Sequence, residues 1–274
     1  MKKSGKILYI EAPDGISGDM MLGALIDLGA GPEEIKSELD KIVHGEYELI
    51  PGAFERNGIH GINLEVLVRE SEGGGESEGV CESGGGGESE GDKHSHDHRH
   101  YSDIKKMIAG SGIREPAKAY ALAIFHAIAE AEAAVHRVDI EHVAFHEVGA
   151  IDSIIDIVGA AIAISSLGVT EFYCSAPRDG SGTIVCRHGL IPVPVPAVAE
   201  MAKGAGIPIV IESDVHTEMI TPTGFGIIKG LGAIFEPHLG IIPERTGYGF
   251  GKRDTGRLGA LRLTIGEKYE EEEA

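Results

Sequence analysis

The segment Ile151–Leu167, IDSIIDIVGAAIAISSL, limits the possible folds more than any other part of this 274-residue chain. Its side chains are apolar nearly all round a helix, which is typical of a helix buried inside a protein. A chain of this length can bury a substantial core, as one large or two modest domains. Its apolar runs fall short of the roughly 18 residues that a membrane-spanning helix needs, so the sequence argues against a membrane protein.

Segments typical of strands alternate with segments typical of helices along the rest of the chain. The predicted strands cover residues 6–11, 47–51, 61–69, 172–175, 183–186, 207–212 and 260–265. The predicted helices cover residues 19–28, 32–43, 102–111, 115–135, 151–167, 197–203 and 221–231. This alternation predicts an α/β fold, with a strand order that the sequence does not give.

Residues 71–100 interrupt this pattern with Gly, Glu and Ser followed by a His-rich stretch. Such a composition cannot bury a core, so we predict a disordered Gly/Glu/His-rich loop over residues 71–101. The prediction is then a small N-terminal α/β unit over residues 1–70 and a larger helical and α/β part over residues 102–266. An acidic tail follows at residues 267–274.

The charge balance argues against nucleic acid as a partner. The formal net charge is -20, and the chain without residues 72–92 and 267–274 still has 32 acidic against 23 basic residues. Phosphate backbones need a basic surface, and bases need aromatic side chains, of which this chain has 5% and no Trp.

The cysteines and the start of the chain point to the cytoplasm. Cys81, Cys174 and Cys186 form no CxxC pair, so the sequence supports neither a disulfide framework nor a zinc ribbon. The opening MKKSGKILYIEAP has an apolar stretch too short for a signal peptide. We therefore expect a cytoplasmic protein.

A tract of alternating histidines is the first candidate site. His94, His96, His98 and His100 share one face of an extended chain, because alternate side chains point the same way. Imidazole suits nickel, zinc and copper, so the tract predicts metal binding without choosing the metal. The alternative is a polar stretch that binds metal only in vitro.

Two carboxylates on the apolar helix form the second candidate site. Asp152 and Asp156 are four residues apart and share a face, and His146 and Glu147 lie just before them. Bare carboxylates in apolar surroundings are costly unless paired or coordinated, so we predict a metal or acid/base site. In the alternative, Asp152 caps the helix and Asp156 pairs with an arginine.

Three glycine-rich turns are weaker candidates for binding an anion. The turn Asp14-Gly15-Ile16-Ser17-Gly18-Asp19 joins the first strand to the first helix, where backbone amides can hold a phosphate. Thr221 and Thr223 offer hydroxyls at another helix start, with Thr221 as the predicted N-cap. Residues 247–254 add Lys252 and Arg253, and residues 187–189 add His188. Turn formation alone also explains each of them.

Six stretches in this order resemble the LarC family of nickel-insertion proteins. They are DGISGDMMLGALIDLG (14–29), HSHDHRHYSDI (94–104), FHEVGAIDSIIDIVGA (145–160), GSGTIVCRHGLIPVPVPA (180–197), TEMITPTG (217–224) and GYGFGKRD (247–254). The resemblance implies nickel insertion into pyridinium-3,5-bisthiocarboxylic acid mononucleotide, which forms the nickel-pincer nucleotide cofactor with CTP and a divalent cation such as Mg or Mn. It also implies a lyase-class chelatase.

The resemblance assigns roles to the candidate residues. The His tract would gather nickel, and Asp14 and Asp19 would bind a cation. The residues that would act in catalysis are His146, Glu147, Asp152 and Asp156. The residues that would hold the mononucleotide are Gly15, Ser17, Gly18, His188, Thr221, Thr223 and Arg253.

Family members commonly carry a further C-terminal region associated with CTP, or obtain it from a second reading frame. Either a partner polypeptide supplies this region, or this protein does not depend on CTP, and we also expect a homo-oligomer. Two other functions stay open. One is a nickel-storage module that needs only the loop, and the other is a metal-dependent phosphohydrolase that uses the four aspartates.

Overall fold

The computed structural model of the chain describes residues 6–44, 46–69, 99–145 and 148–269. Residues 71–98 of the loop predicted over residues 71–101, and residues 270–274 of the acidic tail, lie outside these residues. The prediction is wrong for residues 99–101, which form a short strand and the first residue of a helix. The helices are α1 (Gly18–Asp27), α2 (Pro32–Leu39), α3 (Tyr101–Ala109), α4 (Glu115–His136), α5 (Ile151–Leu167), α6 (Pro196–Ala202) and α7 (Pro222–Gly230), with a 3-10 turn at Ile140–His142.

The strands gather mainly into one mixed sheet. Its seven strands are β11 (Ile234–Phe235), β6 (Glu171–Cys174), β1 (Lys6–Glu11), β13 (Ala260–Lys268), β12 (Ile241–Phe250), β3 (Ile59–Arg69) and β2 (Glu46–Arg56), in that order across the sheet. Three small pairs lie beside it: β4 (Arg99–His100) with β5 (Ala144–Phe145), β7 (Arg178–Asp179) with β10 (Val210–Ile211), and β8 (Thr183–Cys186) with β9 (Gly189–Pro192). The α/β class predicted from the sequence is therefore confirmed.

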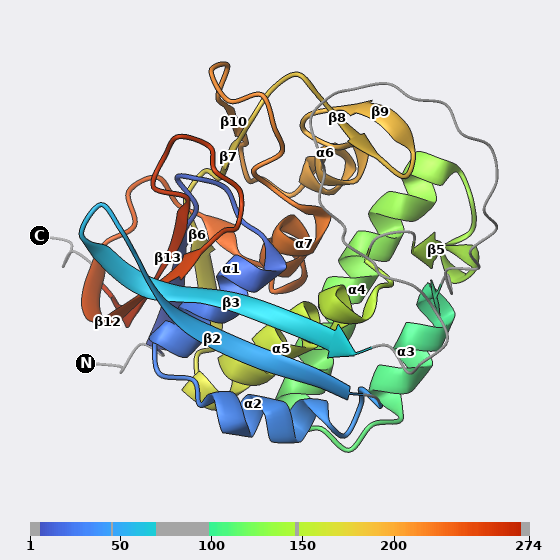
Figure 1. Cartoon of the computed structure of the whole chain (residues 1–274), viewed down its shortest axis with the longest axis horizontal. Coiled ribbons are helices and arrows are strands. Elements are labelled where there is room, and N and C mark those ends of the chain that lie inside the picture. Colours follow the sequence, from blue (N-terminus) through green and yellow to red (C-terminus); the bar gives the residue numbers. More distant parts are fainter. Residues whose placement is uncertain (1–5, 45, 70–98, 146–147, 270–274) are drawn as a thin grey trace, which may run out of the picture.

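The sheet joins distant parts of the chain. Strand β1 runs parallel to β6 on one side and antiparallel to β13 on the other, so the beginning and the end of the described chain are neighbours. The β2–β3 hairpin, blue to cyan in Figure 1, forms one edge of the sheet. Its turn lies at Asn57 and Gly58, both with positive φ, as a tight hairpin requires.

Helix α5 lies at the centre of the helical layer, as its apolar sequence predicts. It packs against α1, α2, α4 and α7, and every residue from 157 to 164 is buried (Figure 1). Helix α1 lies between α5 and the sheet, where it contacts β3 and β12. Gly18, at the start of α1, lies against Asp156 of α5, and this meeting places the candidate site.

The prediction of a glycine-rich turn over residues 247–254 is wrong for residues 247–250, which belong to a strand. Gly247 and Gly249 belong to β12, and a Cβ on Gly249 would lie 1.9 Å from the Met20 carbonyl oxygen of α1. These glycines let a helix approach the strand closely, and they are not part of a phosphate-binding loop. Lys252 and Arg253 follow the end of β12, in the connection to β13.

The predicted strand over residues 207–212 is shorter than expected. Only Val210–Ile211 pairs, with β7, because Pro208 has no N–H to donate to a ladder. The helix that starts at Pro32 ends at Leu39, four residues before its predicted end.

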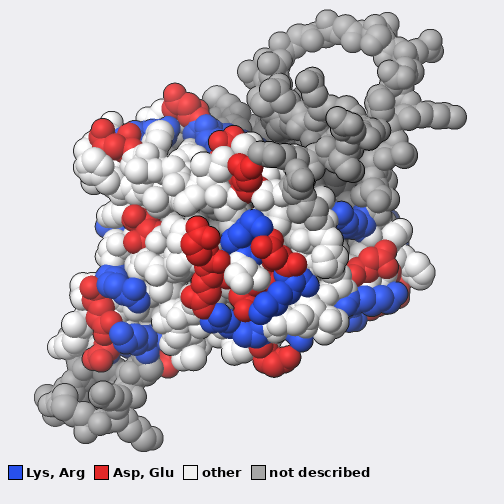
Figure 2. Space-filling view, turned by 60° about the horizontal axis from the view of Figure 1, so that its bottom comes forward, with Lys and Arg blue, Asp and Glu red and all other residues white. Residues whose placement is uncertain are grey.

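The surface mixes charges of both signs. Figure 2 shows Lys and Arg side chains beside Asp and Glu side chains on one face, without a large field of either sign. Over the described residues, the helices are too short or too polar to cross a bilayer.

Candidate functional site

The starts of helices α1 and α7 meet at the turn after β1. The backbone N–H of Ile16 donates to the Met219 carbonyl at 2.9 Å, and the N–H of Thr221 donates to the Ile16 carbonyl at 3.0 Å. A Cβ on Gly224 would lie 2.2 Å from the Ile16 oxygen, so only glycine permits this approach. The structure thus brings together two glycine-containing segments that are some 200 residues apart in the sequence.

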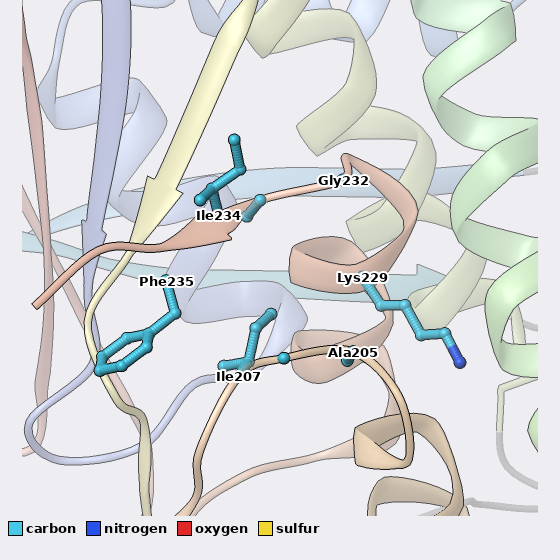
Figure 3. Close-up of a pocket in the computed structure, with 8 residues that line it drawn as sticks. Ala205, Ile207, Lys229, Gly232, Ile234 and Phe235 are labelled. Carbon is cyan, nitrogen blue, oxygen red and sulfur yellow. The ribbon is translucent and has the colours of Figure 1, made fainter.

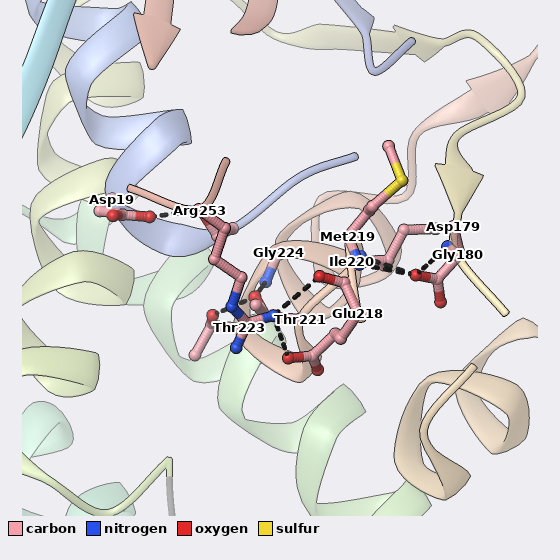
Figure 4. Close-up of polar contacts among 11 residues, drawn as sticks. Asp19, Asp179, Gly180, Glu218, Met219, Ile220, Thr221, Thr223, Gly224 and Arg253 are labelled. Atoms are coloured by element: carbon pink, nitrogen blue, oxygen red, sulfur yellow. Dashed lines mark hydrogen bonds and ion pairs between the residues drawn. The ribbon is translucent and has the colours of Figure 1, made fainter. Parts of the chain in front are cut away.

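The two threonines lie at the start of α7. Thr221 is the N-cap, as predicted, and its Oγ1 accepts a hydrogen bond from the Gly224 N–H at 3.1 Å. The hydroxyls of Thr221 and Thr223 are 2.8 Å apart. The Thr221 hydroxyl therefore caps α7, and the Thr223 hydroxyl lies beside it at the start of the helix (Figure 4).

Arg253 joins this group from the other side. Its Nη1 donates to the carbonyl oxygen of Glu218 at 2.7 Å and to its Oε2 at 2.9 Å. The Glu218 side chain is 8% exposed, whereas the Arg253 side chain is 43% exposed. The Arg253 guanidinium is thus held by Glu218 and remains partly exposed to solvent, close to Thr221 and Thr223 in Figure 4. A guanidinium in this position can pair with a phosphate.

Asp19 lies in the first turn of α1, with Ser17 as the N-cap residue. Its Oδ1 accepts from the Ser17 hydroxyl and from the Met20 N–H, the latter at 2.9 Å. Lys252 Nζ lies 4.0 Å from Asp19 Oδ2. Ser17 therefore orients Asp19, and a phosphate here would meet a carboxylate unless a cation lay between them.

Asp156 is a carboxylate of the site with a buried, unpartnered oxygen. It lies against the first turn of α1, where a Cβ on Gly18 would be 2.9 Å from its Oδ2, and its Oδ1 is buried without a hydrogen-bond partner. Loss of hydration raises the pKa of Asp156 well above its ordinary value, and the charges of Asp19 and Asp152 raise it further. Lys252 opposes this shift.

Asp152 and Asp156 do not follow the alternative interpretation. The N-cap of α5 is Ala150, and Asp152 Oδ1 accepts from the Ser153 N–H at 2.7 Å within the first turn. The cation that acts on Asp156 is Lys252, where the alternative required an arginine. Three carboxylates with one ammonium remain, and we call this set the Asp19–Asp152–Asp156 cluster. Carboxylate oxygens are ligands of hard divalent cations, although these three side chains do not surround one metal position as they stand.

Asp14 and Gly15 have structural contacts beside this cluster. Asp14 Oδ2 accepts from the Gly259 N–H at 3.0 Å, which fastens the end of β1 to the start of β13. Gly15 has φ of +88°, and a Cβ there would lie 2.1 Å from the Met219 oxygen. Gly15 therefore shapes the turn, and the cation-binding role predicted for Asp14 remains a prediction.

Sequence reasoning missed Asp179, which holds the segment before α7 in place. Asp179 is fully buried, and its Oδ1 accepts from the N–H groups of Gly180, Met219 and Ile220 at 2.8, 2.8 and 3.1 Å. Burial raises its pKa, against the effect of these bonds, and its Oδ2 has no partner. The only signal in the sequence was an acid before Gly-Ser-Gly, which turn formation already explains.

The end of the His tract pairs with the residues that precede His146. Arg99 and His100 pair with Phe145 and Ala144 as strands β4 and β5, and Arg99 Nη1 donates to the Gly149 carbonyl at 3.2 Å. His100 is the N-cap residue of α3. The described end of the tract is therefore fastened to the segment that leads into α5.

Several predicted site residues lie outside the described residues: His94, His96, His98, His146 and Glu147. His188 is described, and it lies on the β8–β9 hairpin, where its ring is 5.2 Å from that of His136 at the end of α4. The structure therefore places the His188 ring beside the end of α4, and its predicted part in holding the mononucleotide remains a prediction. Among the described side chains, no three of the His, Cys, Asp and Glu type already surround one metal position.

An apolar pocket lies at the opposite end of α7. It is lined by Ala205, Gly206, Ile207, Lys229, Gly232, Ala233, Ile234 and Phe235. Figure 3 shows the Lys229 side chain extending away from the apolar lining. The pocket therefore offers no convergent polar groups and is separate from the candidate site at the start of α7.

Comparisons with known proteins agree on one family. A family profile described as "Nickel insertion protein" matches residues 8–274. A protein of Lactiplantibacillus plantarum, named pyridinium-3,5-bisthiocarboxylic acid mononucleotide nickel insertion protein, is 48% identical over 95% of this chain and 61% of its own length. Proteins with the same name from Acetivibrio thermocellus and Geobacillus kaustophilus are 43% and 42% identical over 97% and 96% of this chain.

The chain spans about three fifths of the length of these relatives, 62% and 60% for the last two. No solved structure matches the chain significantly.

Proposed function

Because this chain belongs to the nickel insertion protein family, we propose that it inserts nickel into pyridinium-3,5-bisthiocarboxylic acid mononucleotide, as its curated relatives are named for doing. The product is the nickel-pincer nucleotide cofactor. The chain spans about three fifths of the length of those relatives, so we also propose that it shares the activity for which the longer proteins are named.

One observation carries the proposal beyond the family name. Asp156, with its unpartnered Oδ1, lies beside Asp19 at the start of α1, and the start of α7 with its threonines adjoins the same turn. The cluster supplies oxygen ligands for Mg or Mn, and Thr223 and Arg253 supply donors for a phosphate. A bound Mg or Mn would neutralise the phosphate and the carboxylates together.

The second part of the site concerns nickel, which is the substrate metal. We assign nickel gathering to His94, His96, His98 and His100, because the described end of that tract pairs with β5, directly before His146. Formation of a nickel–carbon bond on a pyridinium ring releases a ring proton, so a base must accept it. His146 or Glu147 is our candidate for that base.

Other requirements follow from the family resemblance. We propose CTP dependence, a lyase-class reaction, a cytoplasmic location and a homo-oligomeric state. We also propose that a C-terminal region, of the kind that the resemblance associates with CTP, takes part in the reaction.

A metal-dependent phosphohydrolase is the second candidate function. The Asp19–Asp152–Asp156 cluster beside two threonine hydroxyls is the observation that favours it. It predicts hydrolysis of simple phosphate esters with Mg or Mn and no requirement for a sulfur-bearing pyridinium substrate.

The test is an insertion assay on the full chain with nickel, the pyridinium substrate, CTP and Mg, with and without the separate C-terminal region of a relative. The nickel-bearing nucleotide is detected by its mass. We expect product from wild type and at least a tenfold lower rate from Asp156→Asn, with Asp103→Asn on the exposed face of α3 as control. Hydrolysis of simple phosphate esters without any nickel product would favour the hydrolase.

A further inference from the structure

The β8–β9 hairpin brings a thiol and an imidazole together. Its two-residue turn, Arg187 and His188, places the Cys186 Sγ 3.9 Å from the His188 Nδ1, and the His188 N–H donates to the same sulfur at 3.4 Å. Both residues lie on the surface, and Cys186 is not part of a disulfide. The hairpin therefore holds two good ligands for a borderline metal within reach of solvent.

Helix α4 adds a third ligand. His136 is its last residue, and the His136 and His188 rings are 5.2 Å apart at 35°. One turn earlier, Glu132 Oε2 lies 3.2 Å from the His136 Nε2. A carboxylate on one nitrogen of an imidazole is the usual arrangement around a metal-binding histidine, because it fixes the ring and leaves the other nitrogen to the metal.

The distances are close to those of a metal site. A divalent ion with bonds of about 2.3 Å to sulfur and about 2.0–2.1 Å to nitrogen holds those atoms roughly 3.1–3.6 Å apart, at square-planar to tetrahedral angles. The observed 3.9 Å needs a shift of a few tenths of an ångström. His136 must turn toward the pair, since the three described side chains do not yet share one position.

The other described thiol is unsuited to this role. Cys174 is buried in β6, where burial raises its pKa to about 12. A metal ligand must be a thiolate, so Cys186 is the thiol of the described chain that a metal can reach.

We propose that Cys186, His188 and His136 bind a borderline divalent cation such as nickel, and that Glu132 orients His136. This site is distinct from the His tract and from the Asp19–Asp152–Asp156 cluster. Only the choice of nickel rests on the proposed function; the metal binding itself does not depend on the insertion activity.

The test is a titration of the full, reduced chain with nickel, followed by the thiolate-to-nickel charge-transfer absorption, a signal that imidazoles alone do not give. We expect the band in wild type and its loss in Cys186→Ser. Cys81→Ser and Cys174→Ser keep the band. Replacing His94, His96, His98 and His100 with Ala also leaves it in place.

The contribution of α4 is tested in the same titration. Glu132→Gln lowers the affinity roughly tenfold to a hundredfold, as for other carboxylates that orient metal-bound imidazoles. His142→Gln, an exposed histidine on the neighbouring 3-10 turn, leaves the affinity unchanged.

A band that survives Cys186→Ser, or that disappears in Cys81→Ser, overturns the proposal. The insertion assay separates this failure from that of the proposed function. If Cys186→Ser loses the band but still inserts nickel, the metal site is confirmed and insertion does not depend on it. If wild type inserts nickel but shows no band, the metal site is overturned and the proposed function stands.

Discussion

Asp156 and Gly18 are in contact across the junction of α5 and α1. A Cβ on residue 18 would lie 2.8 Å from the Asp156 Cβ and 2.9 Å from its Oδ2, closer than side chains tolerate. The absence of a side chain at Gly18 therefore lets a carboxylate reach the start of α1. The position of Asp156 within the Asp19–Asp152–Asp156 cluster depends on this contact.

Gly18→Ala should destabilise the protein because its methyl group must displace Asp156 or part α1 from α5. We expect a loss of about 1–3 kcal/mol in the free energy of unfolding, measured in urea. Gly112→Ala is the control, since a Cβ there meets only Lys41 Cδ at 3.8 Å. Equal losses of unfolding free energy in both variants would mean that a methyl group fits beside Gly18 without displacing Asp156.

Asp156 should make stability depend on pH. Its pKa in the folded state is raised, so with rising pH the unfolded state ionises first, above an ordinary value of about 3.9. The metal-free wild type therefore loses stability as the pH rises from there toward the raised pKa. Asp156→Asn removes this decline, which urea unfolding at a series of pH values detects. If the stability of wild type and of Asp156→Asn changed with pH in the same way, Asp156 would not be the cause of the decline.

Mg or Mn should restore the stability that the carboxylates cost. A cation that binds only the folded cluster stabilises it by about 2.7 kcal/mol at a hundredfold excess over its Kd. We expect this gain in wild type by thermal unfolding, and little of it in Asp19→Asn or Asp156→Asn. An equal gain in stability in wild type and both variants would mean that the cation binds outside the Asp19–Asp152–Asp156 cluster.

The sequence predicted α5 at its observed bounds because burial on all sides leaves an unmistakable pattern. It also predicted the Thr221 cap, which depends on neighbours within one helical turn. It did not distinguish the glycines of β12 from those of a turn. Both uses of glycine avoid a side chain, and only the facing helix α1 tells them apart.

Asp179 shows why part of the site was beyond sequence reasoning. Its Oδ1 bonds to N–H groups 40 and 41 residues away, and no local pattern records such a partner. The meeting of the α1 and α7 starts likewise reflects the sheet order, in which β6 lies between β1, the strand before α1, and β11, the strand after α7.

Asp179→Ala should be among the most destabilising single changes at the site. It leaves the N–H groups of Met219 and Ile220 buried without an acceptor, at about 1–3 kcal/mol each. Asp179→Asn keeps the Oδ1 acceptor, so we expect it to retain most of the stability in urea unfolding. Similar losses for Ala and Asn would show that the charge matters and the acceptor does not.

Arg99→Ala should affect nickel supply more than folding. Arg99 is partly exposed, and its side chain donates a hydrogen bond to the Gly149 carbonyl at 3.2 Å, so we expect a loss of about 1 kcal/mol or less. Without it, the end of the His tract is held less firmly beside β5. The insertion rate should therefore fall several-fold at limiting nickel and recover at saturating nickel, whereas Lys106→Ala on the exposed face of α3 changes neither. A rate that stays low at saturating nickel would instead indicate damage to the start of α5, where Gly149 lies.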